Sequence, residues 1–199
     1  MSDLSLTEFV DIATVTTDRK VAKIRNAKNK EPYNPAFDFY KRLRDGIVSA
    51  HKSSDNKRAL NKILTNQTDK KKITNYPNVI AGYKKFWGSK KISWIEPPKE
   101  QMVSHNISVS VNPEIGISFN NKNYIVKLYF KREKLAKARV NMILQLMEET
   151  LRSSVPDDYV FSVLDIRRAK LIEPTVEIKD ASIVLDAEMS LIASVWDKV

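Results

Sequence analysis

The chain contains no cysteine, and among its 199 residues it has two histidines and four glycines. Without cysteine, disulfide bonds, thiolate metal sites and cysteine nucleophiles are excluded. His51 and His105 leave little material for a histidine-rich metal centre or a serine–histidine triad. The glycines do not have the GxGxxG or GxxxxGKS/T spacing of phosphate-binding loops. The sequence therefore has no complete motif for catalysis or cofactor binding.

Long apolar runs are also missing, because no run approaches the roughly 18 residues that a membrane-spanning helix needs. The N-terminal sequence MSDLSLTEFV is acidic and amphipathic, whereas an export signal begins with a basic stretch and continues as an apolar run. We therefore expect a soluble protein that is not exported, has no membrane partner and stays in the cytoplasm. With 42% apolar residues, the chain is long enough for one substantial domain or two small ones.

Positive charge is abundant and unevenly distributed. The formal net charge is +10, and residues 1–100 hold 21 Lys and Arg against 11 Asp and Glu. Residues 101–199 hold 13 of each kind, so the excess lies in the first half. A basic half suits a polyanionic partner such as nucleic acid, the surface of an acidic protein or an anionic membrane. The alternative is that these lysines only keep the surface solvated.

The first hundred residues are predicted to form several helices. Ser5, with Glu8 three residues later, has the capping-box pattern that begins a helix. Asn34 followed by Pro35 is a typical cap and first turn, and it predicts a helix that extends to about residue 51. Two further helices are expected at residues 55–64 and 77–87. The segment TDKKKIT, residues 68–74, is expected to be a loop or a fraying helix end.

The last of these helices interleaves aromatic and basic residues in the sequence GYKKFWGSKK. Helical spacing places the aromatic rings in a core or a domain interface and leaves the lysines in solvent. The lysines are therefore candidates for nucleic-acid contacts, and they are Lys84, Lys85, Lys90 and Lys91.

Two adjacent prolines in IEPPKEQ, residues 95–101, rule out regular structure there and indicate a boundary. The chain thus divides into a helical basic region, residues 1–95, and an α/β region, residues 102–199, which are either separate domains or one packed unit. Alternating apolar residues predict a strand at residues 107–111. A hairpin follows, with its turn at Asn121 and Lys122.

This turn sets the register of the hairpin and the residues on its two faces. It pairs Phe119 with Tyr124 and Ile115 with Leu128 on an apolar face. On the opposite face it pairs Glu114 with Tyr129 and Gly116 with Lys127, and Lys131 lies beyond. That face is either an ordinary solvated sheet surface or a binding surface. In the second case Lys127 and Lys131 contact phosphates and Tyr129 offers a plane for stacking.

A long helix is predicted at residues 133–152, followed by a strand within DDYVFSVLDIRRAK whose apolar run is typical of a strand buried on both faces. A strand, a long helix and a strand favour a right-handed parallel crossover. A final helix is expected at residues 180–197. We thus predict an α+β fold with a helical basic N-terminal half, a C-terminal mixed sheet of about four strands in βββαβ order, and a closing C-terminal helix.

Over residues 106–170, this order of elements resembles the αβββαβ core of the PD-(D/E)xK nuclease-like superfamily. Pro113 and Glu114 stand where that family has its first acid, and Gln145 is similar in placement to a glutamine on the helix of some branches. The resemblance implies acids that hold a divalent cation and a lysine that positions or activates the attacking water.

The sequence departs from that pattern at the second acid. Two residues before Lys127 stands Ile125, and two residues before Lys131 stands Tyr129, so neither lysine completes an acid-x-lysine motif. A hard cation on Glu114 would need a second carboxylate, from Asp165 or from the helical half.

Three functional hypotheses follow. The first is a non-catalytic or degenerate nuclease-like module without a cofactor that binds nucleic acid through its basic half and through Lys127, Tyr129 and Lys131. The second is a magnesium-dependent nuclease in which Glu114 binds the metal and Lys127 acts in catalysis. The third is an interaction subunit whose basic surface binds an acidic protein.

Overall fold

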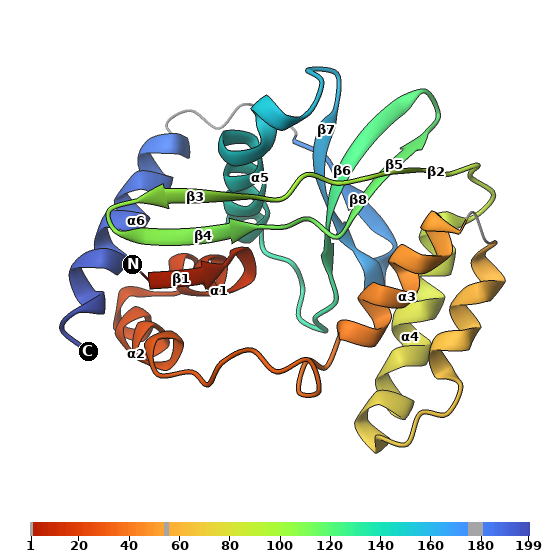
Figure 1. Cartoon of the computed structure of the whole chain (residues 1–199), viewed down its shortest axis with the longest axis horizontal. Helices are drawn as coiled ribbons and strands as arrows, with labels where there is room; N and C mark the ends of the chain where they lie inside the picture. Colours follow the sequence, from red (N-terminus) through yellow and green to blue (C-terminus); the bar gives the residue numbers. More distant parts are fainter. Residues whose placement is uncertain (1, 54–55, 175–180) are drawn as a thin grey trace.

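The computed structural model describes residues 2–53, 56–174 and 181–199, and in these residues the strands form two sheets that lie side by side (Figure 1). The first sheet has the order β1 (Ser2–Ser5), β4 (Ile107–Val111), β3 (Glu100–Ser104). The second has the order β2 (Ser93–Ile95), β5 (Ile115–Phe119), β6 (Lys122–Tyr129), β7 (Val160–Asp165), β8 (Lys170–Ile172). The predicted α+β class is confirmed, with a largely helical N-terminal half.

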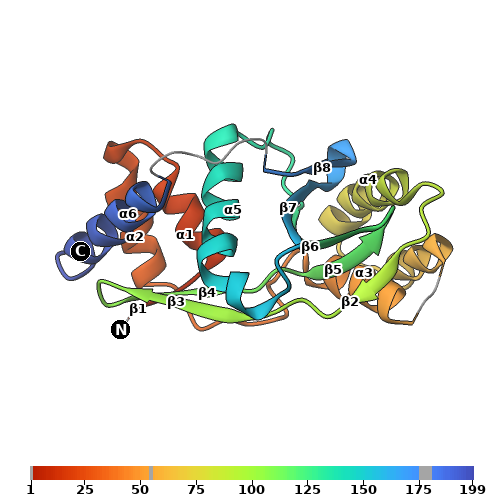
Figure 2. The same cartoon turned by 90° about the horizontal axis from the view of Figure 1, so that it is seen from above.

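Helices cover both sheets, as Figure 2 shows from above. Near the first sheet lie α1 (Leu6–Ala13), α2 (Thr17–Lys28) and α6 (Ala181–Trp196). Beside the second sheet lie α3 (Lys41–Lys52), the 3₁₀ helix η1 (Lys57–Leu64) and α4 (Lys70–Trp87). Helix α5 (Lys137–Leu151) lies between the sheets, and it continues into η2 (Arg152–Ser154). A third short helix, η3 (Ile166–Arg168), connects β7 to β8.

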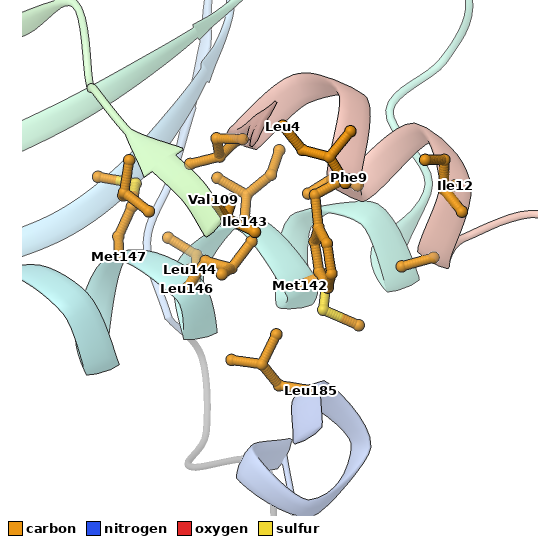
Figure 3. Close-up of a cluster of buried hydrophobic side chains, with 14 of the residues drawn as sticks. Leu4, Phe9, Ile12, Val109, Met142, Ile143, Leu144, Leu146, Met147 and Leu185 are labelled. Atoms are coloured by element: carbon orange, nitrogen blue, oxygen red, sulfur yellow. The ribbon is translucent and has the colours of Figure 1, made fainter. Parts of the chain in front are cut away.

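Two hydrophobic cores result from this arrangement. In the first, Leu4 of β1, Phe9 of α1 and Val109 of β4 pack with side chains of α5 and with Leu185 of α6 (Figure 3). In the second, α3, η1 and α4 pack on the other face of the larger sheet. Each core takes side chains from both sides of the proline-containing segment at residues 95–101, whose ends belong to β2 and β3 although the whole segment was predicted to be irregular.

The hairpin of β5 and β6 has a different register from the predicted one. Asn120 and Asn121 form its turn, both with positive φ, and Phe119 pairs with Lys122 instead of Tyr124. The true register differs from the predicted one by two residues, and a shift by two leaves every side chain on its own face. The predicted apolar face is therefore buried as a whole, and it consists of Ile115, Ile117, Phe119, Tyr124, Val126 and Leu128.

The strand beside β5 in the larger sheet is not the one that the sequence predicted. Strand β2 pairs with β5, while the predicted strand at residues 107–111 is β4 of the other sheet. Strands β3 and β4 are thus inserted between β2 and β5. Strand β7 lies parallel to β6, as the crossover through α5 predicts.

Four helix predictions differ from the structure, and the first is that α5 begins at Lys137 and not at residue 133. The Asn34 side chain accepts a hydrogen bond from the Ala36 N–H at 3.0 Å and so forms a local turn, and α3 begins only at Lys41. The TDKKKIT segment is helical from Lys70, because Asp69 accepts hydrogen bonds from the next backbone N–H groups and caps α4. Residues 57–64 form a 3₁₀ helix, and Asp55, where that helix was expected to begin, lies outside the described residues.

The second core contains a buried histidine whose titration should dominate the loss of stability in mild acid. His51 is 3% exposed, its Nε2 lies 2.8 Å from the Tyr83 hydroxyl, and its ring stacks on Trp87. Burial lowers the pKa of His51 from 6.5 to about 4. As the pH falls, His51 is therefore protonated in the unfolded chain while it stays neutral in the folded protein. The free energy of unfolding falls by about 2 to 3 kcal/mol between about pH 7 and pH 4.5 as a result.

Urea unfolding of the wild type and of His51→Phe at these two pH values measures this loss. The variant lacks the titrating ring, so its free energy of unfolding should change much less over the same range. Equal pH dependence in both proteins would contradict the assignment to His51.

Candidate functional site

The carboxyl ends of the two parallel strands β6 and β7 lie at one edge of the larger sheet, where Tyr129 is paired with Asp165. Such an edge is where open α/β sheets bind ligands. Here the chain leaves β6 through residues 130–136 and leaves β7 through η3. Side chains of α1, α2, α3, α4 and α5 reach the same place.

Two adjoining hollows occupy this edge. The first, called the Glu114 pocket, has a volume of about 110 Å³ and lies between Arg44, Glu114 and Lys127. The second, called the basic cleft, has a volume of about 560 Å³. The residues that line both hollows are Tyr40, Tyr129, Lys131 and Arg139.

The Glu114 pocket contains an ion pair. The Oε1 atom of Glu114 lies 2.5 Å from the Lys127 Nζ, and the Leu128 backbone N–H donates to the other carboxylate oxygen at 2.7 Å. Both paired side chains are only 12% exposed. The predicted register placed Glu114 opposite Tyr129, but the true register places it beside Lys127. This half of the predicted polar face is therefore largely shielded from water.

Arg44 adds a further positive charge near this pair. Burial alone would lower the pKa of Arg44, but hydrogen bonds and charge attraction from Asp38, with a contribution from Glu114, raise it. In the described residues no group of three or more His, Cys, Asp or Glu side chains is placed to share a metal ion. Asp165 does not reach Glu114, because it binds Arg168 at 3.0 Å and accepts a hydrogen bond from that residue's backbone N–H.

Cationic side chains from several elements surround the basic cleft. They are Lys23, Lys131, Arg132, Lys134, Arg139 and Arg167, and the cleft has two carboxylates, Asp11 and Glu133. Asp11 lies between Lys131, at 2.7 Å, and Arg139, and it pairs with both. Burial would raise the pKa of the Asp11 carboxyl, but hydrogen bonds from Arg139 and Lys131 outweigh burial and lower it.

Of the remaining cations of the cleft, all but Arg167 are available to bind a ligand. Within the described parts of the chain, Lys23, Arg132 and Lys134 form no ion pair, and Arg132 and Lys134 are exposed. Ala136, the N-cap residue of α5, also lines the cleft, and no side chain caps that helix. The positive end of the helix therefore adds to the field of these cations.

Arginine side chains of η3 hold the wall of the cleft in place. Arg167 donates from Nε to the Phe130 carbonyl oxygen at 2.9 Å and from a terminal nitrogen to Asn75 of α4 at 3.2 Å. The Tyr129 hydroxyl donates to the Glu133 carbonyl oxygen at 3.1 Å. The segment at residues 130–136 is thus held at Phe130 and at Glu133, on either side of Arg132.

The structure brings together some of the predicted site residues. Lys127 lines the Glu114 pocket, and Lys131 and Tyr129 line both hollows. The Tyr129 ring is only 8% exposed, so it offers little free surface for stacking. Gln145 lies elsewhere, on the surface of α5, where it binds Glu149 at 2.6 Å.

The predicted lysines of GYKKFWGSKK lie at the far end of α4 and beyond it. Lys84 donates to Asn61, and the Lys90 ammonium lies 4.8 Å from the centre of the Phe86 ring. Asn75 is the part of α4 that lines the cleft, and the ten residues from there to Lys85 extend about 15 Å along the helix. These lysines form a surface separate from the cleft.

Comparison of the chain with protein-family models, with curated proteins and with solved structures finds no significant match. Within the residues that the structure describes, no helix has both the length and the apolar character that crossing a membrane requires.

Proposed function

We propose that the protein is a nucleic-acid-binding, non-catalytic, nuclease-like module that holds phosphate groups in its basic cleft. One observation carries this proposal: six cationic side chains from α2, the segment after β6, α5 and η3 surround a single cleft that has two carboxylates. Asp11 already neutralises part of this positive charge, and a bound anion would reduce the repulsion among the cations that remain. A chain of phosphates fits these cations better than a single small anion, because Arg132 and Lys134 are exposed outside the Asp11 ion pairs.

The order of elements supports the nuclease-like part of the proposal. Helix α4, strands β2, β5 and β6, helix α5 and strand β7 follow the αβββαβ order, with β3 and β4 as an insertion. Glu114 precedes the second of these strands, and its carboxylate contacts Lys127 on the third. Ile125, which stands two residues before Lys127, is 0% exposed, and this favours a non-catalytic role for the pair. We also propose a cytoplasmic location, which agrees with the absence of cysteine.

Charge reversal in the cleft tests the proposal. Arg132→Glu combined with Lys134→Glu should weaken binding of labelled DNA and RNA by about 10-fold or more, because phosphate contacts are lost. Each lost contact should also lower the salt dependence of the affinity. In the wild type, about three phosphate contacts predict a loss of affinity between about 50 and 200 mM salt that is roughly 40-fold for duplex DNA and roughly 20-fold for a single strand. Fluorescence anisotropy at these two salt concentrations gives both quantities.

The matched control is Lys85→Glu combined with Lys91→Glu, which makes the same change of net charge at the far end of α4. This control should bind almost as the wild type does, and a loss equal to that of the cleft variant would place the contact surface on α4 instead. Absence of any DNA or RNA binding at low salt would overturn the proposal and favour an acidic protein partner. Urea unfolding of each variant verifies that it folds.

A further inference from the structure

Two aromatic rings project into solvent from the segment between α2 and α3. Phe37 is 85% exposed and Tyr33 is 66% exposed. The segment is nevertheless ordered, because the Asp38 carboxylate accepts hydrogen bonds from the Tyr33 hydroxyl at 3.0 Å and from the Tyr40 N–H at 3.1 Å, and pairs with Arg44. A turn at Asn34 precedes it. The rings are therefore presented on a fixed support and do not belong to either core.

Chain neighbours of Phe37 line two basic hollows. Ala36 and Asp38, the neighbours of Phe37, line a hollow of about 540 Å³ between α3 and η1, here called the α3–η1 hollow. Tyr40 lines the basic cleft, and three residues of chain span at most about 11 Å, so Phe37 lies close to both. The basic side chains that line the α3–η1 hollow are Lys41, Arg42, Lys62 and Lys72, beside the carboxylates of Asp38 and Asp45.

Exposed aromatic rings beside basic grooves are the arrangement that binds unpaired nucleic acid. In a single strand the bases are free to stack on aromatic side chains while the phosphates contact cations, and every base has a face for stacking. In a duplex the base faces are already stacked inside the helix, so the same rings gain little contact. Exposed lysines alone would not distinguish the two, because single strands and duplexes both carry phosphates.

We infer that the ligand of the proposed nucleic-acid site is single-stranded DNA or RNA, whose unpaired bases stack on Phe37 and Tyr33 while its phosphates lie in the basic cleft and in the α3–η1 hollow. This inference rests on the proposed function and adds the class of substrate. The two rings then give the preference for a single strand over a duplex, and the cations give the affinity for nucleic acid of either form.

The test compares labelled single-stranded DNA, single-stranded RNA and duplex DNA, each of about 20 nucleotides or base pairs, at one salt concentration. The wild type should bind the single strands more tightly than the duplex. Phe37→Ala should lower the affinity for single strands about 5- to 150-fold, as the loss of one stacked base predicts, and leave the duplex affinity and the salt dependence unchanged. Phe37→Trp should retain the affinity, because it keeps a ring.

Val103→Ala is the matched control, because Val103 is 55% exposed on β3 of the other sheet. It should bind every probe as the wild type does. Equal affinity for single strands and duplex, or equal losses of affinity for both in Phe37→Ala, would overturn this inference. The proposed function would still hold if the wild type shows salt-dependent binding and the Arg132→Glu, Lys134→Glu variant loses it. If no probe binds, both fail. Comparison of the DNA and RNA single strands shows which of them is preferred.

Discussion

Glu114→Ala is expected to destabilise the protein by about 3 to 5 kcal/mol, the range found when one partner of a buried ion pair is removed. The reason is that Lys127, whose side chain is 12% exposed, would keep its charge with no carboxylate at contact distance. The Leu128 N–H would also lose its acceptor, which adds the cost of an unsatisfied backbone donor. Urea unfolding near neutral pH measures the difference.

A double-mutant cycle separates the ion pair from the backbone hydrogen bond. Glu114→Gln keeps an acceptor for the Leu128 N–H but removes the charge, and Lys127→Met removes the charge of its partner while keeping a long side chain. The double variant should lose less stability than the two single losses together, because no unpaired charge remains. A loss within about 0.5 kcal/mol for Glu114→Ala would instead indicate an ordinary solvated pair, as on an exposed sheet face.

The same Glu114→Gln variant decides the nuclease alternative. If the protein cleaves nucleic acid with Mg²⁺ or Mn²⁺, and if Glu114 binds the metal, cleavage should disappear in Glu114→Gln while binding remains. Cleavage by the wild type that this variant lacks would contradict a non-catalytic module. Cleavage that the variant retains would point to another site or to a contaminating nuclease.

The hairpin shows how far a sequence pattern can determine structure. Alternation of apolar and polar residues fixed the face of each side chain, because a strand has a period of two. It did not fix the register, because the sequence allows the turn at more than one position. In the structure the turn is at Asn120 and Asn121, which both adopt the positive φ that asparagine tolerates. An error of two residues preserved the faces and changed the partner of Glu114. The sequence pattern therefore could not predict the contact between Glu114 and Lys127, although both residues were candidate site residues.

The basic cleft itself was not predicted, and of the residues that line it only Tyr129 and Lys131 were predicted site residues. Lys131 and Arg167 follow the ends of two strands, so their place at one sheet edge was accessible from the parallel crossover. Asp11 and Lys23 reach the cleft because β1 pairs in parallel with β4, where Ser2 is opposite Ile107. No local pattern in residues 2–5 indicates a strand, since the capping box at Ser5 already signals a helix there. The pairing depends on tertiary contacts alone.

Gly82→Ala is expected to destabilise the protein by about 3 kcal/mol or more, although alanine favours helices by about 1 kcal/mol over glycine. A methyl group on Gly82 of α4 would overlap the Ile166 carbonyl oxygen and would lie 3.2 Å from the Arg167 Cα. Both are backbone atoms of η3, so no side-chain rotation relieves the overlap, and α4 must separate from η3. Arg167 would then lose its position between Phe130 and Asn75, and nucleic-acid binding should weaken together with stability.

Gly46→Ala is the control for this effect, since Gly46 also lies within a helix, α3. Its added methyl group would meet Cγ1 and Cδ1 of the buried Ile63 side chain, which would have to shift, but it would not meet backbone atoms. The gain in helix propensity is the same, so urea unfolding should show a much smaller loss for Gly46→Ala than for Gly82→Ala. Equal losses would mean that crowding in general, and not the backbone contact between α4 and η3, limits these positions. A selective loss at Gly82 would show that the backbone contact between α4 and η3 stabilises the fold and holds Arg167 in place beside the basic cleft.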